Sequence, residues 1–180
     1  MTEHTKPSAD APTVTSSPFR FQLRTDVIQR PGAPAQARNV IEGPDGAAVV
    51  VQRSDGRIAL IRTPVLVPDT GADGLAIPGG TVEAGESPQQ AAERELAEEA
   101  GLTAVRWHPL GRYSLLSHGT MRLHLFAADG AATAAQSRHD ADAGTTVEWW
   151  SLPNALTAVT QGHITLAGGA LGILLFAQQH

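Results

Sequence analysis

The sequence predicts an α/β fold of mixed α+β layers, and three observations support this prediction. Short apolar segments of strand length are separated by turn residues along much of the chain. Segments of helix length with apolar or amphipathic patterns occur near residues 88–100, 154–161 and 166–179. Several of the strands are close enough in sequence to form hairpins. Helices and hairpins mixed in this order pack as layers of helix on sheet.

Composition limits the classes of partner. The chain has 180 residues, enough for one domain with a small appendage, and a formal net charge of −5. This charge argues against nucleic acid and acidic membranes as partners. The longest apolar stretch, 167–177, is too short to span a bilayer. With no cysteine there is no disulfide and no thiolate nucleophile. We therefore expect a soluble, cytoplasmic protein.

Two different regions are predicted within the first 42 residues. Residues 1–17 are rich in Thr, Ser, Pro and Ala, which predicts a disordered tail. Residues 18–42 alternate weakly and are interrupted by Pro31-Gly32, which predicts a small N-terminal extension of short strands.

The next segments predict a hairpin, a loop and a helix. Residues 47–51 and 57–61 are apolar and flank the turn Ser54-Asp55-Gly56. Residues 63–74 are rich in Pro and Gly and predict a loop. Ser87 is an expected N-cap, Pro88 the first helical residue and Gly101 the stop, so the helix should span 88–100.

The second half continues the mixture of strands and helices. Strands are expected near residues 105–116, 121–128 and 147–150, with a polar loop at 129–146. Helices are expected at 154–161 and 166–179. Abundant Ala and Gly, with only 4% aromatic residues, indicate close helix–sheet contacts rather than bulky anchors.

The 88–100 helix carries the most informative pattern. At 100° per residue, its carboxylates Glu95, Glu98 and Glu99 share an arc of roughly 100°. Three adjacent carboxylates repel each other unless a cation lies among them. Leu96 falls on the adjoining apolar face, whereas Arg94 points toward the loop that carries Glu86. The spacing therefore predicts a packing face, an acidic face and an ion pair.

The acidic face predicts a site for a hard divalent cation. Carboxylate oxygens without Cys or His neighbours suit Mg²⁺, or Mn²⁺ in its place, better than zinc or copper. Gly79-Gly80 has no side chains, so its backbone can approach the cation closely. We expect a main-chain carbonyl there, that of Gly79, as a further ligand. Arg94 and Glu86 would then support the ligands by fixing the helix against the preceding loop.

Simpler interpretations exist for each feature. Glutamates on a helix are usually only a solvated surface, but that interpretation does not explain Gly80, Glu86, Arg94 and Gly101 in register. His118, in a turn, is more often a solvated histidine than a ligand.

The complete pattern resembles the Nudix box. Gly80-x5-Glu86-x7-Arg94-Glu95-Leu96-x-Glu98-Glu99-x-Gly101-Leu102 matches that signature at every defined position. The resemblance implies an α/β/α sandwich around a mixed sheet over residues 43–180. It also implies hydrolysis of a nucleoside diphosphate linked to another moiety, with Mg²⁺ held by Glu95, Glu98 and Glu99. The general base of such a reaction would be a glutamate of the motif, with Glu98 our choice because it can face both metal and water, or a loop aspartate such as Asp140 or Asp142.

Other segments are similar to the ADP-ribose pyrophosphatase branch of this family. They are the 19–41 region, Leu110-Gly111-Arg112-Tyr113, and Val147-Glu148-Trp149-Trp150 with the helices after it. This resemblance implies a homodimer formed through the N-terminal strands. His118 replaces a proline usual in that branch, and Arg122 lies in the region of its acidic residue.

The resemblance leaves the substrate open. We interpret Arg112, His118 and Arg122 as substrate-binding residues. A dinucleotide, a coenzyme A-like compound or a nucleoside triphosphate remains an alternative substrate. A non-catalytic nucleotide-sensing module is the alternative from another functional class.

Overall fold

The structure is a computed structural model that describes residues 4–5, 21–63, 74–134 and 145–179. The chain divides into two compact units: residues 1–45 with 113–122, and residues 46–112 with 123–180. Of the predicted tail, only His4–Thr5 is described, as strand β1. Most of the predicted 63–74 loop and the centre of the 129–146 loop lie outside the described residues.

The larger unit is built on a mixed sheet of seven strands, whose main order is β12-β5-β4-β10-β9. Strand β4 is parallel to β10 and antiparallel to β5, β5 is antiparallel to β12, and the short strands β6 and β7 pair with β5 and β4. The strands are β4 (Gly46–Gln52), β5 (Ile58–Thr63), β6 (Gly74–Ala76), β7 (Gly79–Thr81), β9 (Arg106–Ser114), β10 (Arg122–Asp129) and β12 (Thr146–Trp150). A separate pair joins β8 (Leu102–Thr103) to β11 (Ala132–Thr133).

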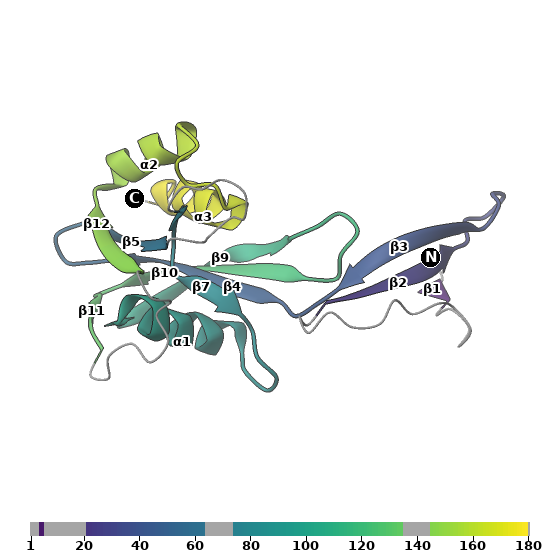
Figure 1. Ribbon diagram of the computed structural model, residues 1–180, viewed down its shortest axis with the longest axis horizontal. Coiled ribbons are helices and arrows are strands. Elements are labelled where there is room, and N and C mark those ends of the chain that lie inside the picture. Colours follow the sequence, from purple (N-terminus) through teal and green to yellow (C-terminus); the bar gives the residue numbers. More distant parts are fainter. Residues whose placement is uncertain (1–3, 6–20, 64–73, 135–144, 180) are drawn as a thin grey trace. The chain divides into compact units, whose positions relative to one another are not determined.

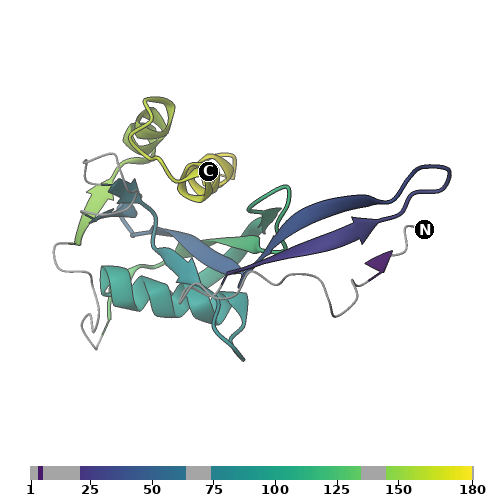
Figure 2. The same cartoon turned by 45° about the vertical axis from the view of Figure 1, so that its right-hand side comes forward.

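Helices cover both faces of this sheet. Helix α1 (Pro88–Ala100) lies on one face, and α2 (Leu152–Thr160) and α3 (Ala167–Ala177) lie on the other (Figures 1 and 2). This arrangement confirms the predicted α/β/α sandwich around a mixed sheet.

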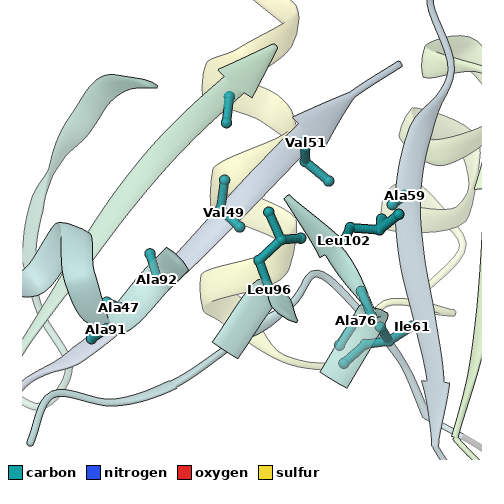
Figure 3. Packing of buried hydrophobic residues seen from close by; sticks show 12 residues of the cluster. Ala47, Val49, Val51, Ala59, Ile61, Ala76, Ala91, Ala92, Leu96 and Leu102 are labelled. Carbon is teal, nitrogen blue, oxygen red and sulfur yellow. The ribbon is translucent and has the colours of Figure 1, made fainter. Parts of the chain in front are cut away.

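The α1 side of the core is made largely of small and branched aliphatic residues. Leu96, Val49 and Val51 are fully buried there, and Figure 3 shows the side chains of this cluster grouped around Leu96. The alanines of α1 and β4 leave room for the close approach of helix and sheet. At roughly 1.5–3 kcal/mol for each fully buried large aliphatic side chain, this cluster is a main source of the unit's stability.

Helix α3 reaches the other face through glycines. A Cβ at Gly172 would lie 3.0 Å from Ile77 Cδ1, and one at Gly168 only 2.5 Å from Leu123 Cδ2. Beside them, Ile173 and Phe176 are completely buried. The abundance of Gly and Ala therefore serves close helix–sheet packing, as the composition predicted.

The smaller unit contains a three-stranded antiparallel sheet, β1-β2-β3. Strands β2 (Gln22–Ile28) and β3 (Gln36–Glu42) pair in register from Gln22↔Glu42 to Ile28↔Gln36. The segment 113–122 is tied to β3, because Ile41 N donates to His118 O at 2.8 Å and Thr120 N donates to Ile41 O at 3.0 Å. The strands expected in this region are thus seven residues each and form one long hairpin.

Two-residue strands escaped the sequence analysis. Strands β8 and β11 are too short to show a period, and only their pairing with each other defines them. Helix α2 begins two residues earlier than expected, because Ser151 is its N-cap and accepts from Asn154 N. Among the described residues, no helix has both the length and the apolar character needed to cross a membrane.

Candidate active site

Local capping signals fix the helix that carries the glutamates. Ser87 Oγ accepts from Gln90 N at 3.2 Å, and Gln90 Oε1 accepts from Ser87 N at 2.8 Å, forming a capping box. At the other end, Gly101 adopts φ +64°, and its N–H donates to Ala97 O at 3.0 Å. Helix α1 therefore begins and ends where the sequence predicted, which fixes the angular positions of its carboxylates.

Arg94 connects α1 to the preceding loop. Its guanidinium donates to both carboxylate oxygens of Glu86, at 3.0 and 3.2 Å, and to Thr81 O at 2.8 Å. The predicted ion pair is present and bidentate. Its two hydrogen bonds fix the relative orientation of the two side chains as well as pairing their charges. The hydrogen bonds from Arg94 and from Glu83 N hold the pKa of Glu86 below its usual value.

The same arginine also contacts two of the predicted metal ligands. Arg94 Nη1 donates to Glu95 Oε1 at 2.8 Å and to Glu98 Oε2 at 3.0 Å. The two carboxylates thus converge on one cationic nitrogen. Burial raises the pKa of Glu95, and the hydrogen bond from Arg94 opposes that effect. Both carboxylates are positioned to share a positive charge.

The two glycines before the loop have separate neighbours. Gly79 N donates to Glu99 Oε2 at 2.8 Å, which holds the third carboxylate against β7. A Cβ at Gly80 would lie only 2.2 Å from Glu95 Oε1. The missing side chain at Gly80 therefore leaves the space that the Glu95 carboxylate occupies.

The donor set fits a hard divalent cation. One carboxylate oxygen of Glu95 and one of Glu98 contact the same cationic nitrogen, Arg94 Nη1. The motif contains no soft ligand such as a thiolate. Over the ranges that the structure describes, no three His, Cys, Asp or Glu side chains are grouped as a preformed metal site. Instead, Arg94 occupies the position between Glu95 and Glu98, and Glu99 is bonded to Gly79 N. The metal-ligand roles of Gly79, Glu95, Glu98 and Glu99 stay predictions.

Glu98, the one candidate for the general base among the described residues, is more open to solvent than the predicted metal ligand beside it. The side chain of Glu98 is 43% exposed, whereas that of Glu95 is 14% exposed. Glu98 can therefore contact water from its ion-paired position, as a base for a water nucleophile must. The other candidates, Asp140 and Asp142, lie outside the described residues.

The predicted substrate-binding residues divide between the two units. His118 and Arg122 line a cavity of about 280 Å³ in the smaller unit, together with Arg24 and Arg38. Arg112, on β9 of the larger unit, is not among the residues that line it. The sequence analysis missed Arg24, Asp26 and Arg38. Arg24 and Asp26 are two residues apart, which predicts that they share one face of a strand. Arg38 lies on β3, and only the β2–β3 register places it opposite Asp26.

Known proteins share this fold and motif. A sequence model of the NUDIX domain matches residues 43–167. An ADP-ribose pyrophosphatase of Mycobacterium tuberculosis is 28% identical over 158 residues, which cover 86% of this chain and 75% of that protein. A CMP-5′-(N-acetyl-N-hydroxy-3-aminopropyl)phosphonate hydrolase of Streptomyces rubellomurinus is 28% identical over 153 residues, which cover 82% of this chain and 70% of that protein.

A solved structure agrees with the fold. The crystal structure of an ADP compounds hydrolase superposes with a TM-score of 0.77 at 19% identity, covering 98% of this chain and 95% of that one. The motif, the sandwich and the match over residues 43–167 lead to one conclusion: the chain belongs to the Nudix family.

Proposed function

We propose that the chain is a Mg²⁺-dependent pyrophosphohydrolase that cleaves the diphosphate of ADP-ribose or a related nucleoside diphosphate sugar. The products would be a nucleotide and a sugar phosphate. Mn²⁺ would replace Mg²⁺ at the same ligands. One observation carries the proposal most strongly: Glu95 and Glu98 converge on a single cationic atom, Arg94 Nη1, inside a complete Nudix motif.

Each motif residue has a role in this reaction. Glu95, Glu98, Glu99 and the carbonyl of Gly79 would hold the divalent ion. When bound, the ion neutralises phosphate charge and makes its bound water a stronger nucleophile. Glu98 would accept the proton of the attacking water, and Arg94 with Glu86 would position the helix and loop.

The bond changes balance without another reactant. The water oxygen forms a bond to one phosphorus, and the bond from that phosphorus to the bridging oxygen breaks. Glu98 takes one water proton and releases it to solvent. One phosphate gains the water oxygen, and the other keeps the bridging oxygen as its leaving group.

The relatives support an ADP-linked substrate and also supply the second candidate. The name of the Mycobacterium tuberculosis relative gives its substrate as ADP-ribose. The name of the Streptomyces rubellomurinus relative specifies a CMP-linked phosphonate. A nucleotide joined to another small molecule through phosphorus is common to both, so a non-adenine nucleotide conjugate is the second candidate.

We also propose that the chain forms a homodimer through the β2–β3 hairpin. Phe21, Leu23 and Val27 are 48%, 39% and 42% exposed, and they alternate along one side of this strand segment. Ile41 lies directly opposite Leu23 and is 36% exposed. An exposed apolar stripe on a hairpin favours burial against another apolar surface, and a second copy presents a matching one.

A substrate panel tests the hydrolase proposal. The purified chain would be incubated with Mg²⁺ or with EDTA and with ADP-ribose, CMP conjugates, dinucleotides, coenzyme A or nucleoside triphosphates. Chromatography would follow the nucleotide products. We expect Mg²⁺-dependent release of AMP and ribose 5-phosphate from ADP-ribose.

The other outcomes separate the alternatives. Cleavage of nucleoside triphosphates alone would contradict the sugar-nucleotide assignment. Binding of nucleotides without turnover of any panel member would instead identify a sensing module.

A further inference from the structure

The smaller unit contains a cavity built on one side of the β2–β3 hairpin. Arg24, Asp26 and Ile28 alternate along β2, and Val40 and Arg38 lie directly opposite Arg24 and Asp26 on β3. These five side chains therefore share one face of the sheet. The cavity of about 280 Å³ is completed by residues 117–120 and Arg122.

The arginines that line this cavity differ in whether a carboxylate neutralises their charge. Arg24 forms ion pairs with Asp26 and Glu42, and its hydrogen bond to Asp26 raises its pKa further above the ordinary value. Within the ranges that the structure describes, Arg38 makes no ion pair or side-chain hydrogen bond. Arg122 donates from Nη1 to Ser114 Oγ at 2.6 Å and has no carboxylate partner there. Two guanidinium charges thus remain available in a chain whose net charge is −5.

The wall beside β3 is held in place by main-chain hydrogen bonds. Segment 117–120 is fixed to Ile41 by the bonds from Ile41 N to His118 O and from Thr120 N to Ile41 O. Arg122 N donates to Asp45 Oδ1 at 2.7 Å, which fixes the start of β10. The segment adds the hydroxyls of Ser117 and Thr120 and the imidazole of His118 to the lining. The cavity lining therefore combines the Arg24–Asp26 ion pair, two further guanidinium groups without a carboxylate partner among the described residues, and the hydrogen-bonding groups of this segment.

We infer that this cavity binds a phosphate group, either free orthophosphate or the terminal phosphate of a monoester. Arg38 and Arg122 would supply the charge, and Ser117, His118 and Thr120 would supply hydrogen bonds. A tetrahedral dianion presents acceptors in several directions, which suits donors on two strands and a loop. One guanidinium group can bind two phosphate oxygens at once through two parallel N–H···O bonds. The inference does not depend on the proposed hydrolysis, because binding here involves no residue of the Nudix motif.

Calorimetry of the full chain without divalent metal tests this site. The titrants are inorganic phosphate, ribose 5-phosphate, AMP, adenosine and acetate, at constant ionic strength. We expect phosphate-bearing titrants to bind and adenosine and acetate to bind at least about tenfold more weakly, since a charge-assisted hydrogen bond is worth roughly a decade in Kd. Tighter binding of AMP and ribose 5-phosphate would identify a monoester, and tighter binding of orthophosphate the free ion.

Variants locate the binding. Arg38→Gln and Arg122→Gln should each weaken phosphate binding at least about tenfold. Arg30→Gln, an exposed arginine of the same unit outside the cavity, should change it by less than about twofold. Thermal unfolding of each variant verifies folding, and the change at Arg38 should leave the fold intact because Arg38 is an exposed strand residue. Unaltered binding in both cavity variants, or equal binding of adenosine and AMP, would overturn the inference.

Discussion

At the scale of single residues, Gly79 and Gly80 are adjacent glycines with different neighbours. A Cβ at Gly79 would lie 2.6 Å from Ala47 O and 2.7 Å from Ala48 Cα, both main-chain atoms. The nearest atoms to a Cβ at Gly80 are those of the Glu95 carboxylate, at the end of a flexible side chain. The missing side chain at Gly79 therefore serves sheet packing, and the missing side chain at Gly80 leaves room for the Glu95 carboxylate.

Alanine substitution should separate these two roles. Gly79→Ala should lower the free energy of unfolding by about 1–3 kcal/mol, because main-chain atoms must move. Gly80→Ala should cost under about 1 kcal/mol, but displacement of Glu95 should lower kcat by roughly 10²-fold. Denaturant unfolding and steady-state kinetics measure the two effects. Wild-type kcat in Gly80→Ala would show that the position of Glu95 is unimportant.

Asp55 gives a pH-dependent marker for the β4–β5 turn. The hydrogen bond from Arg53 and the N–H of Arg57 lower the pKa of Asp55 from 3.8 to about 2. A carboxylate with a lowered folded-state pKa stabilises the fold above its unfolded-state pKa, and this contribution disappears as the pH falls from about 3.8 through about 2. NMR titration of the Asp55 carboxyl should show the low pKa.

A matched pair of variants identifies the cause. Arg53→Gln should raise the pKa of Asp55 toward 3.8, because it removes the main partner. Arg57→Gln keeps the main-chain N–H and removes only a guanidinium 3.9 Å away, so it should change that pKa less. An equal shift in the two variants would contradict this assignment.

At the scale of elements, helix α1 depends on its first turn. Ser87→Ala removes the side-chain acceptor of the capping box and should lower the free energy of unfolding by about 1 kcal/mol. Gln89→Ala, at an exposed position of the same turn, should change it by less than about 0.5 kcal/mol. Chemical denaturation compares the two. Equal effects would mean that the cap does not set the helix start.

The sequence predicts α1 well because its signals are local. Ser87, Pro88 and Gly101 determine the helix bounds, and helical spacing places the glutamates on one arc. Sequence spacing did not predict that Arg94 would bond Glu95 and Glu98 as well as Glu86, because a flexible side chain chooses among several partners. Nor could it predict the cavity around Arg38, which depends on the pairing register of two strands.

At the scale of the whole molecule, the hairpin stripe of Phe21, Leu23, Val27 and Ile41 predicts self-association. Leu23→Lys with Val27→Lys should convert a dimer into a monomer, because burying two unpaired charges in an apolar contact costs more free energy than the contact supplies. Gln22→Lys places one charge on the other side of β2 and should leave the dimer intact. Sedimentation equilibrium gives the masses. A monomeric wild-type chain would contradict the proposed dimer.

The proposed chemistry depends most directly on Glu98. We predict that Glu98→Gln lowers kcat for the proposed Mg²⁺-dependent ADP-ribose hydrolysis by roughly 10²–10⁴-fold, because it removes both a proposed metal ligand and the proposed base. Glu93→Gln is the matched control, since Glu93 is exposed on the same helix and bonds only Gln89 among the described residues. Its kcat should stay within about twofold of wild type. Near-wild-type kcat in Glu98→Gln, with the fold intact, would contradict the assignment of this site.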